Sequence, residues 1–205
     1  MSHSTLDRPG LQRRGLRLEY ATIGWNVGEA VLTISLGVAA ASLALVGFGM
    51  VSIVEVFASG VVVWHLLPGH DVDDSGRTRL ALRLTAGAFA ALSVVLVVGA
   101  VRDLVSGRIA GESPWGIVYL AVTAFVMFGL AVVKRRTADA LDSVPLRSEA
   151  TMTFLDGILS IATLAGLALN AYVGWWWADP AAALLVALAA ANEARENWAE
   201  ASEFT

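Results

Sequence analysis

Two acidic residues stand inside long apolar segments of this chain. Glu55 lies in the stretch GFGMVSIVEVFASG and Asp156 in the stretch TMTFLDGILS, and neither has a basic residue within three positions. A carboxylate in hydrocarbon costs about 3 kcal/mol on insertion scales, so such residues face the interior of a helix bundle, where they bind ions, relay protons or pair with each other. We therefore predict that Glu55 and Asp156 meet across a helix interface and hold a cation. The alternative is a pair of protonated carboxyls that hydrogen-bond between helices.

Other polar side chains share helix faces with these two carboxylates or with each other. Glu149 and Met152 stand seven and four positions before Asp156, and Asn26 stands three positions before Glu29. Residues at these spacings lie on one face of a helix. Oxygen ligands suit hard or borderline divalent cations, and a methionine sulfur adds some softness. The candidate metal ligands are Glu55, Asp156, Met152, Glu149, Glu29 and Asn26.

Each of the four supporting candidates also has a structural interpretation. Glu29 is either a ligand or a hydrogen-bonding residue near the inner leaflet, and Asn26 is either a ligand or a bridge between helices. Met152 is either a sulfur ligand or plain packing. Glu149 follows Arg147 closely, so it is either a ligand or a carboxylate that is solvated or paired locally. The residues alone leave these alternatives open.

Composition determines the broad class of the protein. Hydrophobic residues make up 57% of the 205 residues and charged residues only 16%, against about 25% charged in soluble domains; the mean hydropathy is +0.66. A net charge of -4 without a basic patch argues against a nucleic-acid partner. The absence of cysteine excludes disulfides and thiolate chemistry. Because the sequence also lacks hydrolase and phosphate-loop motifs, we expect no enzyme and no tightly bound cofactor.

The apolar segments predict an all-α, polytopic membrane protein with six transmembrane helices. About 20 residues cross a bilayer core, so the apolar run 19–67 must form two helices, with a turn near 42–49 where Gly47 and Gly49 loosen the backbone. The predicted spans are residues 19–41, 48–67, 80–101, 114–133, 146–173 and 180–198, in a domain of residues 16–200 between a flexible N-terminal tail, 1–15, and a C-terminal tail, 201–205.

The sixth span has recognisable ends. Asp179 followed by Pro180 predicts an N-cap and a first helical residue. Glu193, Arg195 and Glu196 near the other end indicate that the helix emerges into water there.

The basic residues predict the orientation of the spans. Of the 14 Lys and Arg residues, all but Arg102 and Arg108 fall in segments on the same side of the membrane as the N-terminus. Lys134 belongs to this set, because with Arg135 and Arg136 it ends the fourth span. Cytoplasmic segments carry an excess of Lys and Arg. We therefore predict that both termini are cytoplasmic.

The two carboxylate segments resemble a known family. VGFGMVSIVE at 46–55 resembles the second span of bacterial cation diffusion facilitator-like transporters, whose pattern is roughly GFGxDSxxE. LDGILS at 155–160, LALN at 167–170 and GWWWADP at 174–180 resemble the fifth and sixth spans of that family. The likeness extends over residues 19–198.

This resemblance implies a six-helix transmembrane domain, usually dimeric, that exports divalent metals such as zinc from the bacterial cytoplasm in exchange for protons. It places the metal between the second and fifth spans, at Val51 and Glu55 and at Met152 and Asp156. The family's usual aspartate is Val51 in this chain, and its usual histidine is Met152. Half of the implied ligand set is therefore missing.

Our leading hypothesis is a multi-pass transporter of the bacterial inner (plasma) membrane that exports a divalent cation, zinc or a similar transition metal, by proton antiport. Its expected partners are the lipid bilayer, the cation, protons and a second copy of the chain. The alternative is a non-transporting membrane interaction or sensor protein with a degenerate cation site. The replacements at Val51 and Met152 motivate that alternative.

Overall fold

The computed structural model describes residues 8–66 and 75–203, and within these ranges the regular structure is entirely helical. The elements are α1 (Arg8–Ala40), α2 (Leu43–Leu66), α3 (Ser75–Ser106), α4 (Pro114–Leu141), α5 (Val144–Ala168), a π-helical turn (Leu169–Val173) and α6 (Ala178–Glu203). The predicted all-α class is confirmed.

Several helices are long and apolar enough to cross a bilayer. In the described part of the chain these candidate spans are Gly10–Ala40, Leu82–Ser106, Pro114–Leu141 and Glu149–Val173, and α2 contributes a shorter apolar segment, Leu43–Phe57. Large apolar side chains such as Phe125 on α4 and Val105 on α3 are largely exposed on the outside of the bundle. Together these features indicate a multi-pass membrane protein whose outer surface faces lipid.

The turn between α1 and α2 lies at Ala41 and Ser42, where Ala41 has a positive φ of 51°. Gly47 and Gly49 lie inside α2, so the expectation that they loosen a turn was wrong. They instead permit close helix packing, because a Cβ at Gly49 would lie 2.8 Å from Cγ1 of Ile34 on α1. Small residues at such positions let the backbones of membrane helices approach each other.

All six described α-helices extend beyond their predicted spans at one end or both, and α1, α4 and α6 are examples. α1 begins at Arg8, inside the segment 1–15 that we expected to be a flexible tail, and α6 continues to Glu203, inside the expected C-terminal tail. Residues 1–7 of that expected N-terminal tail lie outside the described residues. α4 runs through the basic triplet at 134–136 and ends at Leu141, where the backbone of Asp142 adopts a left-handed conformation. The triplet therefore does not end the helix.

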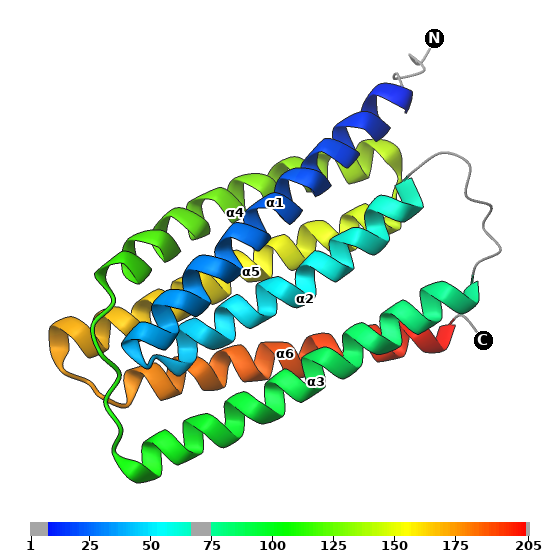
Figure 1. Ribbon diagram of the computed structural model, residues 1–205. Helices are drawn as coiled ribbons and strands as arrows, with labels where there is room; N and C mark the ends of the chain where they lie inside the picture. The colour runs from blue at the N-terminus through cyan, green and yellow to red at the C-terminus, as the bar shows by residue number, and fades with distance from the viewer. Residues whose placement is uncertain (1–7, 67–74, 204–205) are drawn as a thin grey trace.

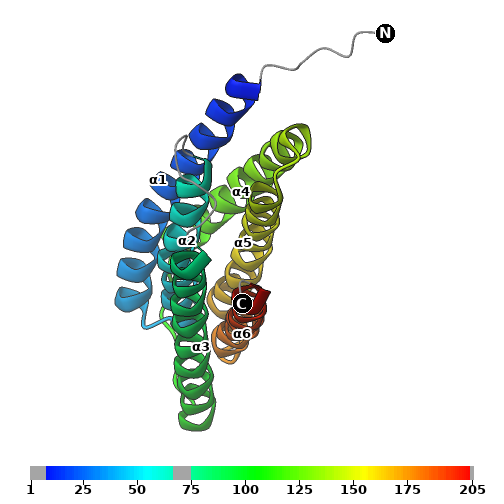
Figure 2. The same ribbon diagram turned by 90° about the vertical axis from the view of Figure 1, so that its right-hand side faces the viewer.

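The helices pack as three close pairs, α1 with α2, α4 with α5, and α3 with α6 (Figure 1). The first two pairs form one group, and the α3/α6 pair touches this group through α2 and α5. The starts of α1, α3 and α5 and the ends of α2, α4 and α6 lie at one end of the bundle, which we call the N-terminal end. Figure 1 shows that the α3/α6 pair diverges from the other helices toward this end, and Figure 2 shows α3 and α6 side by side.

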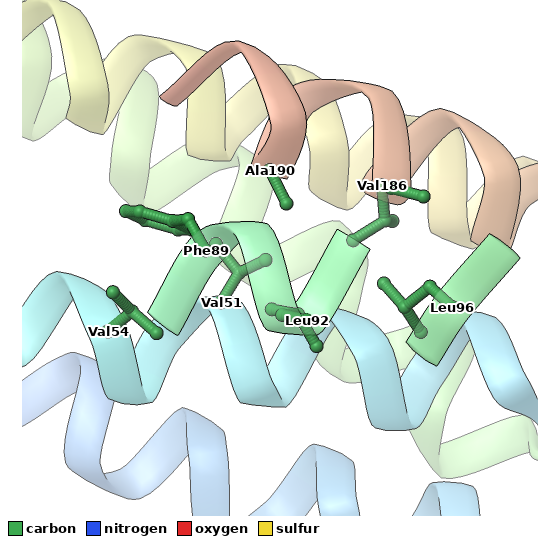
Figure 3. Close-up of a cluster of buried hydrophobic side chains, with 8 residues drawn as sticks. Val51, Val54, Phe89, Leu92, Leu96, Val186 and Ala190 are labelled. Atoms are coloured by element: carbon green, nitrogen blue, oxygen red, sulfur yellow. The ribbon is translucent and has the colours of Figure 1, made fainter. Parts of the chain in front are cut away.

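A buried hydrophobic cluster joins α2 to the α3/α6 pair (Figure 3). Its members are Val51, Val54, Phe89, Leu92, Leu96, Val186, Ala187 and Ala190. Burial of this apolar surface holds the two groups of helices together near the middle of the bundle. Val51 is thus a core residue of the helix interface.

Asp179 joins α6 to the start of α2 at the other end of the bundle. Its carboxylate accepts hydrogen bonds from the Ser42 hydroxyl and from the backbone N–H groups of Leu43, at 3.0 Å, and Ala44, at 3.4 Å. α6 itself begins one residue earlier, at Ala178. The prediction that Asp179 caps α6 was therefore wrong, because this carboxylate caps α2 across the bundle.

We expect Asp179→Ala to lower the free energy of unfolding by about 1–3 kcal/mol, because it leaves two helix N-terminal N–H groups and a buried hydroxyl without an acceptor. Thermal unfolding in detergent measures the effect. Asp139→Ala is the matched control, since that carboxylate is exposed and pairs only with surface arginines. Equal unfolding midpoints for the two variants would contradict the capping role.

Candidate functional site

Glu55 and Asp156 line one cavity of about 200 Å³ between α2, α3, α5 and α6. The structure thus brings the two predicted carboxylates to the same space. The cavity lies at the edge of the hydrophobic cluster, with which it shares several residues. Its lining residues are Val51, Glu55, Phe89, Met152, Leu155, Asp156, Ile158, Leu159, Ala189, Ala190, Asn192 and Glu193.

Asp156 is buried, and no hydrogen-bond donor contacts its carboxylate. Its exposed fraction is 1%, and neither of its carboxylate oxygens has a hydrogen-bond partner. Buried polar atoms in native proteins are nearly always hydrogen-bonded, so an unpartnered buried carboxylate requires a specific explanation.

Glu55 is held by an amide from the neighbouring helix. Its Oε2 accepts a hydrogen bond of 3.0 Å from Nδ2 of Asn26, which lies on α1 and is buried. Asn26 therefore bridges α1 and α2 while it orients the carboxylate. Asn26 forms the bridge between helices that was one of its two interpretations, and it does so through a carboxylate of the candidate site.

Glu29 is fully buried and accepts three side-chain hydrogen bonds within the bundle. Its Oε1 accepts from the Ser52 hydroxyl at 2.8 Å, and its Oε2 accepts from Nε1 of Trp25 at 3.0 Å and from the Thr123 hydroxyl at 3.1 Å. These donors come from α2, α1 and α4. Glu29 does not line the cavity, and in this conformation it serves as a hydrogen-bond acceptor that connects three helices.

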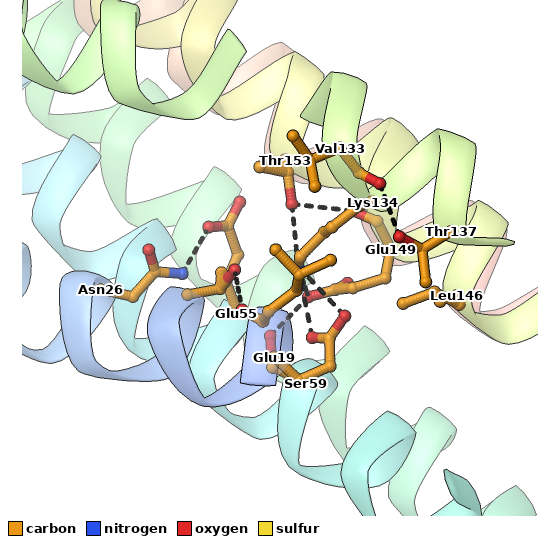
Figure 4. A network of polar contacts seen from close by, with 12 residues as sticks. Glu19, Asn26, Glu55, Ser59, Val133, Lys134, Thr137, Leu146, Glu149 and Thr153 are labelled. Atoms are coloured by element: carbon orange, nitrogen blue, oxygen red, sulfur yellow. Dashed lines mark hydrogen bonds and ion pairs between the residues drawn. The ribbon is translucent and has the colours of Figure 1, made fainter. Parts of the chain in front are cut away.

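Glu149 belongs to a second buried polar cluster, which we call the Lys134 network (Figure 4). Nζ of Lys134 lies 3.2 Å from both oxygens of Glu19, 3.5 Å from Oε1 of Glu149 and 3.1 Å from the Thr153 hydroxyl. The Ser59 hydroxyl also hydrogen-bonds to Glu149. The network therefore joins α1, α2, α4 and α5 through one ammonium and two carboxylates.

The Lys134 network corrects two expectations from the sequence. Lys134 has an exposed fraction of 0%, so it is not a solvated residue at the end of a span. Glu149 is neither solvated nor paired with Arg147, because Arg147 instead contacts Asp139 at 3.0 Å. The physical reason is that α4 extends past residue 134, which places Lys134 inside the bundle.

Met152 lines the cavity beside Asp156 and is partly buried. Its position fits both a sulfur ligand and a packing residue. The other position at which the resemblance implied a ligand, Val51, also lines the cavity and packs in the hydrophobic cluster. The cavity walls therefore carry the four implied positions together, two of them as carboxylates.

Sequence reasoning missed the contribution of α6. Asn192 and Glu193 line the cavity, and Oε2 of Glu193 is buried without a hydrogen-bond partner. The sequence did contain a signal, because Glu193 stands three positions after Ala190 and seven after Val186, both on the buried face of α6. The charge of Glu193 instead suggested that α6 leaves the membrane there, so its place on the buried face of α6 was not predicted.

Among the residues that the structure describes, the cavity is lined by three carboxylates and by no basic side chain. Such a lining creates a negative potential that concentrates cations. In the described ranges, no group of three or more His, Cys, Asp or Glu side chains is gathered closely enough to hold a metal ion. The three carboxylates that line the cavity are thus carried by three different helices, α2, α5 and α6.

Residues 78–202 match the family model described as the cation efflux transmembrane domain. This match covers more than half of the 205-residue chain. The chain belongs to the cation efflux family. The resemblance seen in the sequence is thereby confirmed. No curated protein matches the chain.

The matched region of this cation efflux protein extends from α3 to the end of α6 and contains Met152, Asp156 and Glu193. Glu55, on α2, precedes it. Members of the cation efflux family are transporters and not enzymes as a rule. Family membership and the apolar helices together indicate a multi-pass membrane protein that transports cations.

Proposed function

We propose that this protein exports a divalent metal cation, zinc or a similar transition metal, in exchange for protons, and that the cation passes through the cavity between α2 and α5. The observation that carries the proposal is the buried, unpartnered carboxylate of Asp156, which shares this cavity with Glu55. In a member of the cation efflux family, such a carboxylate is the natural contact for the cargo.

The exchange of the cation for protons follows if the cavity holds either protons or the cation, but not both at once. An isolated carboxylate in a low-dielectric interior costs several kcal/mol, so Asp156 must be neutralised by either a proton or a cation. Deprotonated Asp156 and Glu55 bind the cation when the cavity faces the cytoplasm. Protons that arrive from the opposite side then neutralise the carboxylates and release the cation outward. One cavity that cannot hold both charges at once thus exchanges them.

The supporting residues have distinct roles in this proposal. Asn26 orients Glu55, and Met152 offers a soft sulfur beside Asp156. Glu29 and Glu149 support the site from behind the cavity, where they hold the helices that carry it. Zinc usually takes four N, S or O ligands, so two carboxylates, one sulfur and water would bind it weakly enough for release.

The proposed orientation places the N-terminal end of the bundle in the cytoplasm, with six crossings and both termini on that side. The exposed side chains of Arg13, Arg14 and Arg17 on α1 and of Arg135 on α4 lie toward this end, as the excess of basic residues in cytoplasmic segments requires. We further propose that the protein acts as a homodimer in a bacterial plasma membrane.

Calorimetric titration of detergent-solubilised protein with Zn²⁺, Mn²⁺, Fe²⁺ and Cd²⁺ tests the proposed site. We expect the wild type to bind one of these cations and Glu55→Gln/Asp156→Asn to bind it at least about 100-fold more weakly, because two charged contacts of about 1.5–3 kcal/mol each are removed. Asp139→Asn, which neutralises an exposed carboxylate, should bind like the wild type. Equal affinities for the double variant and the wild type would place the site elsewhere.

The alternative function is a non-transporting membrane interaction or sensor protein. The specific observation in its favour is that two cavity positions, Val51 and Met152, carry uncharged side chains. Failure of the wild type to bind any of the four cations, together with binding by Met152→His, would support this alternative. Cation binding and vesicle transport by the wild type would exclude it.

A further inference from the structure

We propose that Glu193 of α6 is a third carboxylate of the cation path and contacts a partly hydrated divalent cation inside the cavity. This inference deepens the proposed function and rests on it. It assigns to α6 a direct part in cation binding, in addition to the carboxylates on α2 and α5.

The first argument is the placement of Glu193 on the cavity wall. Glu55 on α2 and Asp156 on α5 belong to one group of helices, whereas Glu193 belongs to the α3/α6 pair. The cavity lies between the two groups. A cation in the cavity would therefore have carboxylates from both groups of helices around it.

The second argument is the state of the Glu193 carboxylate. Its Oε2 is buried without a hydrogen-bond partner, as are both oxygens of Asp156 on the opposite wall. The adjacent polar groups of α6 are paired with each other, because Asn192 donates to Glu196 at 2.7 Å and accepts from Arg195 at 3.0 Å. Glu193 takes no part in these contacts and remains available to a cargo ion.

The third argument is the size of the cavity. A volume of about 200 Å³ corresponds to roughly six or seven water molecules at about 30 Å³ each. A divalent cation can thus enter with several of its water ligands, as small hard cations tend to do. Water-mediated contacts are nearly as favourable as direct ones, so carboxylates on separate walls can bind one ion without forming a tight three-carboxylate cluster.

The position along α6 supports the same role. Glu193 lies one turn after Ala190 and two turns after Val186, both of which pack in the hydrophobic cluster. It is therefore the first charged residue of this helix face toward the N-terminal end, where the α3/α6 pair diverges from the other helices (Figure 1). A cation that enters from that end meets Glu193 close to Asp156.

The test compares Glu193→Gln with Glu196→Gln in the full chain. Glu196 is the matched control, because it lies on the same helix three positions further on and is exposed. Titration with Zn²⁺ and Mn²⁺ should show about tenfold weaker binding for Glu193→Gln, since one charged contact is lost. Glu196→Gln should bind within about twofold of the wild type.

Three further measurements distinguish a contact from a long-range field or a folding defect. Glu193→Asp keeps the charge and should bind within about threefold of the wild type if water bridges the contact. The weakening in Glu193→Gln should persist at 0.5 M salt, where the field of exposed charges is screened, and its thermal unfolding midpoint should equal that of the wild type.

The outcomes separate this inference from the proposed function. If Glu193→Gln binds like Glu196→Gln while Glu55→Gln/Asp156→Asn loses binding, Glu193 is not part of the path and the site on α2 and α5 stands. If the wild type binds none of Zn²⁺, Mn²⁺, Fe²⁺ and Cd²⁺, both the proposed function and this inference are overturned.

Discussion

We expect Asp156→Asn to abolish metal-dependent proton movement in reconstituted vesicles and to leave the protein folded. The amide cannot exchange a proton or neutralise a cation, so we expect the rate to fall by at least about 100-fold, which corresponds to the loss of about 3 kcal/mol of charged interaction. Stability should not fall, because Asp156 has no hydrogen-bond partner to lose and removal of a buried charge relieves a desolvation cost.

A pH-sensitive dye inside the vesicles, read after addition of the cation that wild-type protein binds, measures this effect. Asp139→Asn is the control, since it makes the same chemical change at an exposed carboxylate on α4. Thermal unfolding of both variants in detergent reports on folding. Transport by Asp156→Asn at the wild-type rate would show that the proposed site is wrong.

Lys134→Met should lower the free energy of unfolding by about 3–5 kcal/mol. The substitution preserves the apolar stem but removes the ammonium, which leaves the carboxylates of Glu19 and Glu149 buried without their cation. Breaking a buried ion pair by removal of one partner has a cost of this size. Unfolding in detergent, monitored by loss of helical signal, measures the difference.

Two variants sharpen this prediction. Arg135→Met changes the next residue of α4, whose pair with Asp139 is exposed on both sides, so its effect should stay within about 1 kcal/mol. Lys134→Met/Glu149→Gln removes one of the two uncompensated charges and should recover part of the lost stability. A Lys134→Met protein as stable as Arg135→Met would refute a stabilising role for the network.

In the proposed function, the Lys134 network and the cavity have different roles. The network connects α1, α2, α4 and α5, whereas the cavity lies between α2, α3, α5 and α6. The Lys134 network contains its own positive charge, the ammonium of Lys134, and joins the helices of one group. The cavity has carboxylates without a basic partner among the described residues, and it lies between the two groups of helices. The second arrangement, in which the positive charge must come from outside, is the one suited to transport.

The sequence by itself determined the class of the protein, its family and the central pair of carboxylates. Apolar runs of transmembrane length are local features, so the helices could be predicted from composition and length alone. Glu55 and Asp156 were identifiable for the same reason, because a charge within such a run has few explanations. The family match over residues 78–202 then confirmed the family; it includes the motif around Asp156, whereas the motif around Glu55 precedes it.

The partners of the polar side chains were decided only by the tertiary structure. The sequence placed Lys134 in water, assigned Asp179 to its own helix and took Glu193 for a helix end, whereas the fold buries Lys134, directs Asp179 to α2 and turns Glu193 toward the cavity. Each outcome depends on how helices distant in sequence are rotated and how far they extend. That rotation results from the packing of all six helices together, and no local pattern in a single segment contains it.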